Sequence, residues 1–452
     1  MDFSVLGMYN KWWQSGISID VLEKELIGKY EAATFKRVYE KFFDYKTNGL
    51  YVLRGPRQIG KSTLIKYTIF DLLKKGKNSR AIFYFPLDTV KDYVELRDTL
   101  LSYLQFAATE KKRYVFIDEV SMVKNWQRAI KELRDNTVLK GDFVVLTGSS
   151  AWDIKRSSER LPGRKGNVKS NVLLLPLTFS EYFKTTKYEI PTFSIDEILN
   201  FDESKRFELE LSAIDIEQSF YRYLESGGIP SVIECMNNVN DLDSILDSGW
   251  DTMIGDVEKE GLTRSKLIGI LEYLGQRLSQ RFSWTSAASE VEIDTKTFQN
   301  YVDTLGYNYM AMVLKAIDKN SLLQLEKKQK KVYFYDNFVL KNLERKFGIV
   351  QKKSVVVESV VAQNLVFKFS DWLEEGLSNL QNVGYWYSSN GKEIDFIVNG
   401  IPIEVKYQNV INRSDVMTIK KTFGKGIILS KKTLDLSGEV KVIPVHIFLS
   451  MI

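Results

Sequence analysis

The stretch YVLRGPRQIGKSTLIKY, residues 51–67, places a glycine-containing loop between an apolar run and an amphipathic run. Residues 50–53 have the apolar pattern of a buried strand, and apolar residues recur at helical spacing from Ile65 to Leu73. The loop carries the complete pattern G-x-x-x-x-G-K-[ST] in the strand–loop–helix context that gives this pattern its meaning. The alternative, an ordinary glycine-containing turn, is disfavoured by these flanks. The stretch therefore predicts a site for a nucleoside triphosphate.

Each residue type in this loop has a physical role toward phosphate. Glycines let the backbone bend so that its N–H groups point at phosphate oxygens, and the helix N-terminus adds a partial positive charge. Lys61 is expected to bridge the β- and γ-phosphates, and Ser62 to contact Mg²⁺ through its hydroxyl. The predicted nucleotide-binding residues are Gly55, Pro56, Arg57, Gln58, Ile59, Gly60, Lys61, Ser62 and Thr63.

The segment RYVFIDEV, residues 113–120, is an apolar strand that ends in two adjacent acids. Asp118 suits a carboxylate associated with magnesium, and Glu119 suits the base that orients or deprotonates an attacking water. The alternative is that both acids only cap the helix that follows. Together with the phosphate loop, the pair favours hydrolysis of the nucleotide.

A further apolar strand, DFVVLTGSS at residues 142–150, ends in small polar side chains. Thr147, Ser149 or Ser150 is a candidate to sense the γ-phosphate or to place the water, with Ser149 assigned to the catalytic set. A plain strand-to-loop junction explains the same residues equally well. The chain lacks an N-K-x-D motif for guanine after the loop, so adenine, and hence ATP, is the expected base.

The motifs GPRQIGKST, VFIDEV, LTGSS, ERLPGR and LLLPLTFSEYF follow one another in this order. In combination they resemble the archaeal-type ATPases of the AAA superfamily that carry a C-terminal domain similar to restriction endonucleases. The resemblance spans about residues 30–410 and implies an α/β fold. Its parts would be a P-loop NTPase core of AAA/ASCE type, a helical lid, a winged helix and a C-terminal α/β endonuclease-like domain.

The resemblance also implies boundaries and a sheet arrangement. The core would be doubly wound, with the strands at 50–53 and 113–118 side by side and residues 80–88 as a neighbouring strand. Arg164 of the LPGR segment would contact the γ-phosphate, in cis or across a subunit boundary, which leaves a homo-oligomer open; a solvated loop cation is the alternative. The expected domains are 1–48 (N-terminal helical segment), 49–185 (ATPase core), 186–255 (lid), 256–345 (winged helix) and 346–452 (endonuclease-like).

Residues 262–340 show three short helical patterns followed by two apolar stretches, an order that suits a winged helix. Asp294 or Thr295 is expected to cap the third helix. Its Lys296, Gln299 and Asn300 would then face a DNA groove. The wing would carry Lys327, Lys328, Lys330 and Lys331 at a hairpin tip, where they would contact phosphate or only solvate the turn.

The segment GKEIDFIVNGIPIEVKY, residues 391–407, alternates apolar and polar positions around Asn399-Gly400, a strong hairpin signal. Counting outward from this turn places Asp395 opposite Glu404 and Lys406 opposite Glu393 on one face. Opposed carboxylates repel unless a cation lies between them. With Glu358 from a preceding helix, Asp395, Glu404 and Lys406 resemble the PD-(D/E)XK nuclease core. The alternative is a solvated sheet face, or a degenerate site.

The amino-acid composition excludes several classes of protein and favours others. One cysteine, one histidine and no apolar run of membrane-spanning length exclude disulfide frameworks and His/Cys zinc clusters, and favour a cytoplasmic protein without a membrane partner. A net charge of +5 permits contact with nucleic acid. The sequence predicts a Mg²⁺-dependent ATP hydrolase acting on DNA, with or without a nuclease activity. The alternative is an ATP-dependent switch that binds a protein partner and has an inactive C-terminal domain.

Overall fold

The structure, a computed structural model, describes residues 3–39, 42–135, 139, 141–148, 171–185, 190–238, 241–370, 380 and 382–452. The chain divides into two compact units, Met1–Leu175 and Pro176–Ile452. Over the described residues, no helix has both the length and the apolar composition needed to cross a membrane.

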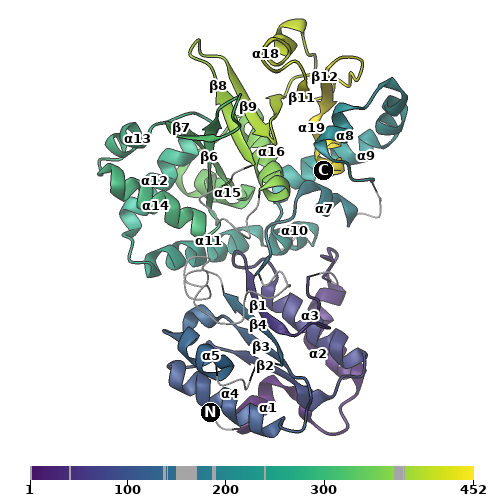
Figure 1. Cartoon of the computed structure of the whole chain (residues 1–452), viewed down its shortest axis with the longest axis vertical. Coiled ribbons are helices and arrows are strands. Elements are labelled where there is room, and N and C mark those ends of the chain that lie inside the picture. Colours follow the sequence, from purple (N-terminus) through teal and green to yellow (C-terminus); the bar gives the residue numbers. More distant parts are fainter. Residues whose placement is uncertain are drawn as a thin grey trace. The chain divides into compact units, whose positions relative to one another are not determined.

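The first unit is a parallel sheet with helices on both faces (Figure 1). Its strands are β1 (Gly49–Arg54), β2 (Ile82–Pro86), β3 (Tyr114–Asp118), β4 (Phe143–Gly148) and β5 (Asn171–Leu173). Its helices are α1 (Phe3–Tyr9), α2 (Ile19–Ala32), α3 (Lys61–Lys74), α4 (Tyr93–Phe106) and α5 (Trp126–Asp135). The predicted α/β class with a P-loop core is thereby confirmed.

The strand order is β2-β3-β4-β1-β5, with every pairing parallel. The expectation that β1 and β3 lie side by side is therefore wrong, because β4 is inserted between them. Each β4 residue is buried, as expected for a central strand covered on both faces. Apolar runs identify buried strands but contain no information on their order. The prediction that residues 80–88 neighbour the acidic strand is confirmed by the pairing of β2 with β3.

The side chains of alternate strand residues pack into two separate hydrophobic cores, one on each face of the sheet. Val52 and Leu146 belong to the core beneath α1, α4 and α5, whereas Leu53 and Val145 belong to the core beneath α2 and α3. This alternation of side chains is what a strand buried on both faces requires. The sheet is thus held rigidly between two helical layers, and its carboxyl edge is left to carry polar side chains.

Two adjacent tryptophans attach the N-terminal segment to this unit. The indole N–H groups of Trp12 and Trp13 each donate to the carbonyl of Ile82, at 3.0 Å. Trp13 also stacks between Phe3 and Tyr103 in parallel-ring geometry. Both rings therefore pack on the first unit and tie the N-terminal segment to it.

The second unit combines a helical region with a mixed sheet. Its helices are α7 (Phe179–Lys184), α8 (Ile195–Leu199), α9 (Arg206–Ser226), α10 (Pro230–Asn237), α11 (Leu242–Lys259), α12 (Arg264–Gln276), α13 (Trp284–Glu290), α14 (Thr295–Tyr307), α15 (Asn337–Phe347), α16 (Lys353–Phe369), α18 (Arg413–Phe423) and α19 (Val445–Met451). Its strands are β6 (Ala311–Ile317), β7 (Gln324–Phe334), β8 (Val383–Tyr387), β9 (Glu393–Val398), β10 (Ile401–Lys406), β11 (Gly426–Ser430) and β12 (Val440–Pro444).

One seven-stranded sheet runs through this unit in the order β12-β11-β10-β9-β8-β6-β7. Figure 1 shows β6 and β7 continuing the sheet of the C-terminal strands, where β6 joins β8 in parallel through Ala316 and Tyr385. The hairpin after α14, where the sequence places the wing, therefore also forms the edge of the C-terminal sheet.

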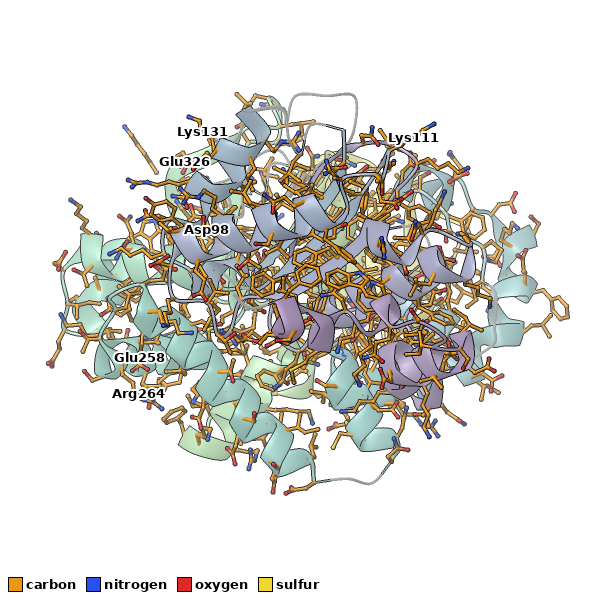
Figure 2. The ribbon with its side chains drawn as sticks, turned by 90° about the horizontal axis from the view of Figure 1, so that it is seen from below. Asp98, Lys111, Lys131, Glu258, Arg264 and Glu326 are labelled. Carbon is orange, nitrogen blue, oxygen red and sulfur yellow. The ribbon has the colours of Figure 1, made fainter. Side chains whose placement is uncertain are left out.

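Helices α12, α13 and α14 precede that hairpin, as the sequence predicted. The turn between α11 and α12 is spanned by an ion pair of Arg264 with Glu258 at 3.5 Å (Figure 2). Asp294 is the residue that caps α14, because its Oδ1 accepts the Thr297 N–H at 2.9 Å.

The expected lysine cluster at the hairpin tip is wrong in part. The tip lies between residues 317 and 324, whereas all four lysines lie within β7. Lys327 and Lys328 are exposed, but Lys330 and Lys331 are only 2% and 1% exposed. The strand is long enough to carry its later residues into the protein interior, which a local charge pattern cannot reveal.

A buried glycine turn joins α9 to α10. The Gly228 N–H donates to Asp336 Oδ2 at 2.6 Å, and the Gly228 carbonyl accepts the Leu177 N–H at 2.8 Å. A Cβ on Gly228 would lie 2.2 Å from the Leu177 carbonyl oxygen. The segment between α9 and α10 is thus a tightly bonded turn.

Gly228→Ala is expected to lower the free energy of unfolding of the second unit by about 1–3 kcal/mol or more, because the contact is with backbone that cannot rotate away. The matched control is Gly255→Ala on α11, where a Cβ meets nothing within 4 Å. That change is expected to be neutral or to stabilise by up to about 1 kcal/mol through helix propensity. Denaturant unfolding of both variants measures the difference; equal stabilities would contradict the close approach.

Asp336, which holds this turn, gives the unit a defined pH dependence. Burial raises the pKa of its carboxyl from 3.8 to about 6, against the opposing effect of the Gly228 and Phe338 N–H groups. The folded state therefore binds this proton more tightly than the unfolded state, so the stabilisation is complete below the ordinary pKa and is lost as the pH rises through 6. Relative to Asp336→Asn, the wild type is expected to lose about 2 kcal/mol of unfolding free energy between about pH 4.5 and 7.5. Denaturant unfolding at several pH values measures this loss. If the carboxyl did not titrate in that range, the unfolding free energies of wild type and Asp336→Asn would change with pH in parallel.

Candidate functional site

The phosphate loop connects β1 to α3, and close packing fixes its shape. Gly60 has a φ of 97° and Gly55 a φ of 154°, and a Cβ on Gly55 would lie 2.0 Å from the Leu174 carbonyl oxygen. Only glycine fits such a position. Lys61, at the first turn of α3, is 5% exposed and its Nζ donates to the carbonyls of Gly55 and Pro56 at 2.8 Å each. The lysine is thus held over the loop that the helix N-terminus faces.

The acids reach the same edge of the sheet from neighbouring strands. Asp118 ends β3 and Thr147 lies near the end of β4, and the carboxyl ends of parallel strands share one edge with the loop after β1. The Thr147 hydroxyl donates to Asp118 Oδ1 and accepts the Glu119 N–H at 3.0 Å. Tyr84, from β2, donates its hydroxyl to Asp118 Oδ2 at 3.0 Å. One threonine therefore fixes both acids relative to each other.

Glu119 has a left-handed backbone conformation, with a φ of 55°. A non-glycine residue pays a conformational cost there, and such strain is often found where a side chain must be aimed. The bond from its N–H to Thr147 holds this conformation in place. Of the remaining predicted residues, Ser62 lies on the first turn of α3, while Ser149, Ser150 and Arg164 lie outside the described residues.

These residues fit ATP with Mg²⁺. Gly55 and Gly60 have positive φ angles that bend the loop as a phosphate cradle requires, and Lys61 and Ser62 open a helix of fourteen residues. Each oxygen of the Asp118 carboxylate accepts one hydroxyl and keeps a lone pair for a further donor, such as a water on the metal. Ser62, Asp118 and Glu119 supply oxygen atoms, which are the ligands that Mg²⁺ prefers.

The four predicted C-terminal residues are also brought together. The hairpin register pairs Ile401 with Val398 and Ile403 with Phe396, which makes Asp395 and Glu404 the next opposed positions, as expected. Asp395 Oδ2 accepts the Val405 N–H at 2.9 Å.

The two remaining predicted residues complete this face of the sheet. Glu358 projects from α16 and accepts the Tyr333 hydroxyl at 2.6 Å. Lys406 pairs with Glu404 at 2.8 Å and not with Glu393, the partner that simple counting gave.

A lysine that the nuclease resemblance does not include lies among these acids. Lys331 Nζ is 2.5 Å from Glu393, 3.4 Å from Asp395 and 3.5 Å from Glu358. Arg281 holds the other oxygen of Glu393 at 2.7 Å. Burial opposes the charge of Lys331, but the carboxylates of Asp395, Glu358 and Glu393 outweigh it and raise the pKa of the ammonium.

Two of the acids, Glu358 and Glu404, resist losing their protons. Burial, followed by the charge of Asp395, raises the pKa of both Glu358 and Glu404 to about 7. Glu404 Oε2 is buried and accepts no hydrogen bond within the described part of the chain. Among the described residues, no group of three or more His, Cys, Asp or Glu side chains is arranged to hold a metal ion. The cluster therefore does not fit the divalent cation that an endonuclease core implies, because an ammonium takes the central place.

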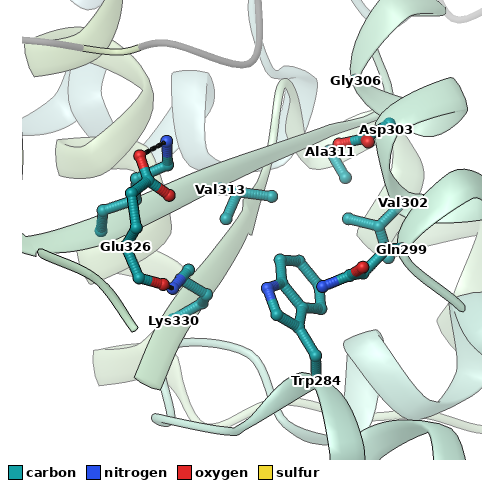
Figure 3. A pocket seen from close by; sticks show the side chains of 10 residues that line it. Trp284, Gln299, Val302, Asp303, Gly306, Ala311, Val313, Glu326 and Lys330 are labelled. Carbon is teal, nitrogen blue, oxygen red and sulfur yellow. Dashed lines mark hydrogen bonds and ion pairs between the residues drawn. The ribbon is translucent and has the colours of Figure 1, made fainter. Parts of the chain in front are cut away.

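The region of α14 expected to face DNA is only partly exposed. A cavity of about 260 Å³ lies between α14 and the β6–β7 hairpin, and Figure 3 shows Gln299 beside Trp284 on its wall. Lys330 lines the same cavity and donates its ammonium protons to the carbonyls of Glu326 and Lys328. Lys296 and Asn300 remain exposed on the helix.

Sequence reasoning missed three of the residues that shape these sites: Tyr84, Lys331 and Tyr333. Lys331 and Tyr333 are two apart on one strand, so alternation places them on the same face. That signal existed in the sequence. The acids that this face meets could not be read from it, because they lie 25 to 64 residues away along the chain.

Three family matches cover most of the chain. Residues 47–183 match the family described as "AAA domain". Residues 217–349 match "Domain of unknown function (DUF8612)", and residues 353–448 match "Domain of unknown function (DUF4143)". The first match contains the phosphate loop and both acids, and identifies this domain as an ATPase of the AAA type.

Similar proteins are of low identity. An uncharacterized protein of Methanocaldococcus jannaschii, MJ1637, is 25% identical over 332 residues, which cover 71% of this chain and 68% of the relative. An uncharacterized protein of Haemophilus influenzae is 23% identical over 406 residues, which cover 85% of this chain and 90% of the relative.

Among solved structures, the ORC2 protein of Aeropyrum pernix has a TM-score of 0.37 at 11% identity, covering 76% of this chain and 93% of that one. The ORC1 protein of Aeropyrum pernix in complex with DNA has a TM-score of 0.30 at 10% identity, covering 66% and 87%.

Proposed function

Because residues 47–183 form an ATPase domain of the AAA type, we propose that this chain is a Mg²⁺-dependent ATP hydrolase that acts on DNA through its second unit. The observation that carries the proposal is the hydroxyl of Thr147, which bonds to both Asp118 and the Glu119 N–H at the edge of the sheet where the phosphate loop lies. Two acids placed in this way are typical of sites that hydrolyse a nucleotide, and are not needed for nucleotide binding alone.

The roles of the residues follow from their positions. The backbone N–H groups of residues 55–60 and the α3 N-terminus bind phosphate oxygens, and Lys61 neutralises them. Glu119 accepts a proton from the attacking water. Ser62 and Asp118 would hold Mg²⁺, which would neutralise the charge that develops on the phosphates. Ser149 and Arg164 are retained as proposed contacts of the γ-phosphate.

The DNA part of the proposal is supported by the arrangement of α12 to α14. Three helices in this order with an exposed Lys296 and Asn300 on the third suit insertion into a groove, as in a winged helix. Lys327 and Lys328 lie exposed on the adjoining strand and suit phosphate contact. Residues 186–255 and 256–345 are accordingly proposed as lid and winged helix.

We assign residues 346–452 an endonuclease-like fold that holds DNA without cutting it. This assignment is supported by the Lys331 ammonium, which lies within 3.5 Å of Glu358 and Asp395, where a nuclease would need a metal ion. Incubation of labelled duplex and single-stranded DNA with Mg²⁺ is expected to leave both intact; cleavage that Glu404→Ala removes would overturn this assignment.

A second candidate is a nucleotide-dependent switch that binds a protein partner. It is favoured by an exposed apolar stripe on α9, where Phe207, Leu211 and Ile214 are each more than 70% exposed. Their spacing of four and three residues places them on one face of the helix. Such a face suits contact with another protein better than with DNA.

The rate of ATP hydrolysis, measured with duplex, branched and single-stranded DNA, tests the proposal, with Lys61→Ala as the blank. At least one DNA form is expected to accelerate turnover, and Lys296→Ala together with Lys327→Ala and Lys328→Ala is expected to weaken that effect. Hydrolysis that ignores every DNA form but responds to a bound protein would favour the switch. In that case Phe207→Ser with Leu211→Ser should remove the response.

A further inference from the structure

The acid cluster of the C-terminal sheet includes a buried lysine, Lys331, which lies outside the matched family region that contains the acids. Lys331 lies on β7, within the match at 217–349, whereas Glu358, Glu393, Asp395 and Glu404 all lie within the match at 353–448. The Lys331 side chain is 1% exposed and reaches Glu393, Asp395 and Glu358 within 3.5 Å. A lysine so deeply buried remains charged only because carboxylates surround it.

The charges of the cluster nearly balance. Four carboxylates, of Glu358, Glu393, Asp395 and Glu404, face three cations, of Lys331, Lys406 and Arg281. When all of these groups are ionised, one negative charge is left over. Without Lys331, two would be left over, which is the charge of one divalent cation. The buried and unbonded Oε2 of Glu404 marks a free ligand position in that same cluster.

We propose that Lys331 is a built-in counter-ion that takes the place of a divalent metal ion and keeps these acids free of metal. Its ammonium offers N–H donors to the carboxylates and neutralises them without accepting a water ligand. The inference deepens the proposed non-cutting role of residues 346–452 and rests on it. It also explains why a face with the residues of a metal site has no arrangement able to hold a metal, among the residues described.

The neighbouring Lys330 provides a matched control. It is equally buried on the same strand, but it points to the opposite face, into the cavity beside α14. Its ammonium bonds to the backbone carbonyls of Glu326 and Lys328, and no carboxylate of the C-terminal cluster contacts it in the described structure. Lys330→Met thus removes a buried charge from the same strand without touching the acids.

The test measures Mn²⁺ binding to the full chain by electron paramagnetic resonance in the absence of nucleotide. To remove the metal site of the ATPase unit from the signal, every protein carries Asp118→Asn. Lys331→Met is expected to bind one additional Mn²⁺ at least about 10-fold more tightly than the parent protein, because two uncompensated charges replace one. Its melting temperature is expected to fall without metal and to rise with Mn²⁺. Lys330→Met is expected to show neither the additional binding nor the rescue by metal.

A second variant covers the case in which Lys331→Met does not fold. Lys331→Met with Glu393→Gln restores the formal charge of the parent cluster while Glu358, Asp395 and Glu404 remain. It is expected to fold and to bind Mn²⁺ more tightly than the parent, though less tightly than Lys331→Met. A folded variant of either kind with no additional Mn²⁺ site would overturn the proposal, as would a parent protein that already binds this metal. None of these readouts involves ATP turnover or DNA, so failure here is distinct from failure of the ATPase proposal.

Discussion

Glu119→Gln is expected to reduce ATP hydrolysis by about 10²–10⁴-fold while nucleotide binding is retained. The amide keeps the size of the carboxylate but cannot accept a proton from water. The Glu119 backbone remains bonded to Thr147 through its N–H, so the change removes a chemical function without disturbing the loop. Phosphate release measures the loss of hydrolysis, and calorimetric titration with ATP and Mg²⁺ measures retained binding.

Glu132→Gln is the control for this substitution. Glu132 lies exposed on α5 in the same unit and is 3.8 Å from Arg97, a surface pair of little energetic value. Its loss is expected to leave hydrolysis within about a factor of two of wild type. If Glu119→Gln behaved in the same way, another group would have to be the base.

Lys61→Ala is expected to weaken nucleotide binding strongly and to abolish hydrolysis. The lysine is buried, and its ammonium bonds to the carbonyls of Gly55 and Pro56, so its removal takes away both the positive charge and a fastening of the loop. A charge-assisted bond to phosphate in such a site contributes about 1.5–3 kcal/mol, and the disordering of the loop adds to this loss. ATP affinity measured calorimetrically is expected to fall by at least about 10-fold to 100-fold.

Lys74→Ala, at the exposed last turn of the same helix, is the control for charge alone. It alters the net charge by the same amount but lies a helix length from the phosphate loop. Its ATP affinity is expected to equal that of wild type. A similar loss in both variants would show that general electrostatics, and not the loop, determines binding.

Local signals in the sequence predicted the parts of the structure that local geometry determines. The loop from Gly55 to Gly60 and the turn at Asn399-Gly400 were predictable because particular backbone conformations need particular residues. The hairpin register confirms this, since Asn399 and Gly400 have φ angles of 50° and 83°. The helix around Glu358, with its β-branched valines, formed as α16 because its tertiary packing overrides a small propensity cost.

Contacts between distant segments were not predictable in the same way. The insertion of β4 between β1 and β3 depends on how whole strands pack, not on any one of their sequences. Lys331 was placed at an exposed tip because charged residues usually solvate turns. The strand instead carries it under α16, where the acids that stabilise its charge come from two other elements, α16 and β9. The candidate ATP site remained readable because its motif residues cluster close to strand ends, whereas the acid cluster needed the fold to complete it.

The seven-stranded sheet has a consequence for anyone who divides this protein for expression. A fragment starting near residue 353 would follow the family boundary, but it would strip β6 and β7 from the sheet and leave β8 as a bare edge. Bare edges recruit other strands and lead to aggregation. The same cut would remove Lys331, whose charge offsets the carboxylates of the acid cluster. In the shortened fragment these carboxylates would repel one another at neutral pH. The smallest self-sufficient fragment must begin upstream of the β6–β7 hairpin, and an insoluble C-terminal fragment would reflect the place of the cut, not an inability of that region to fold.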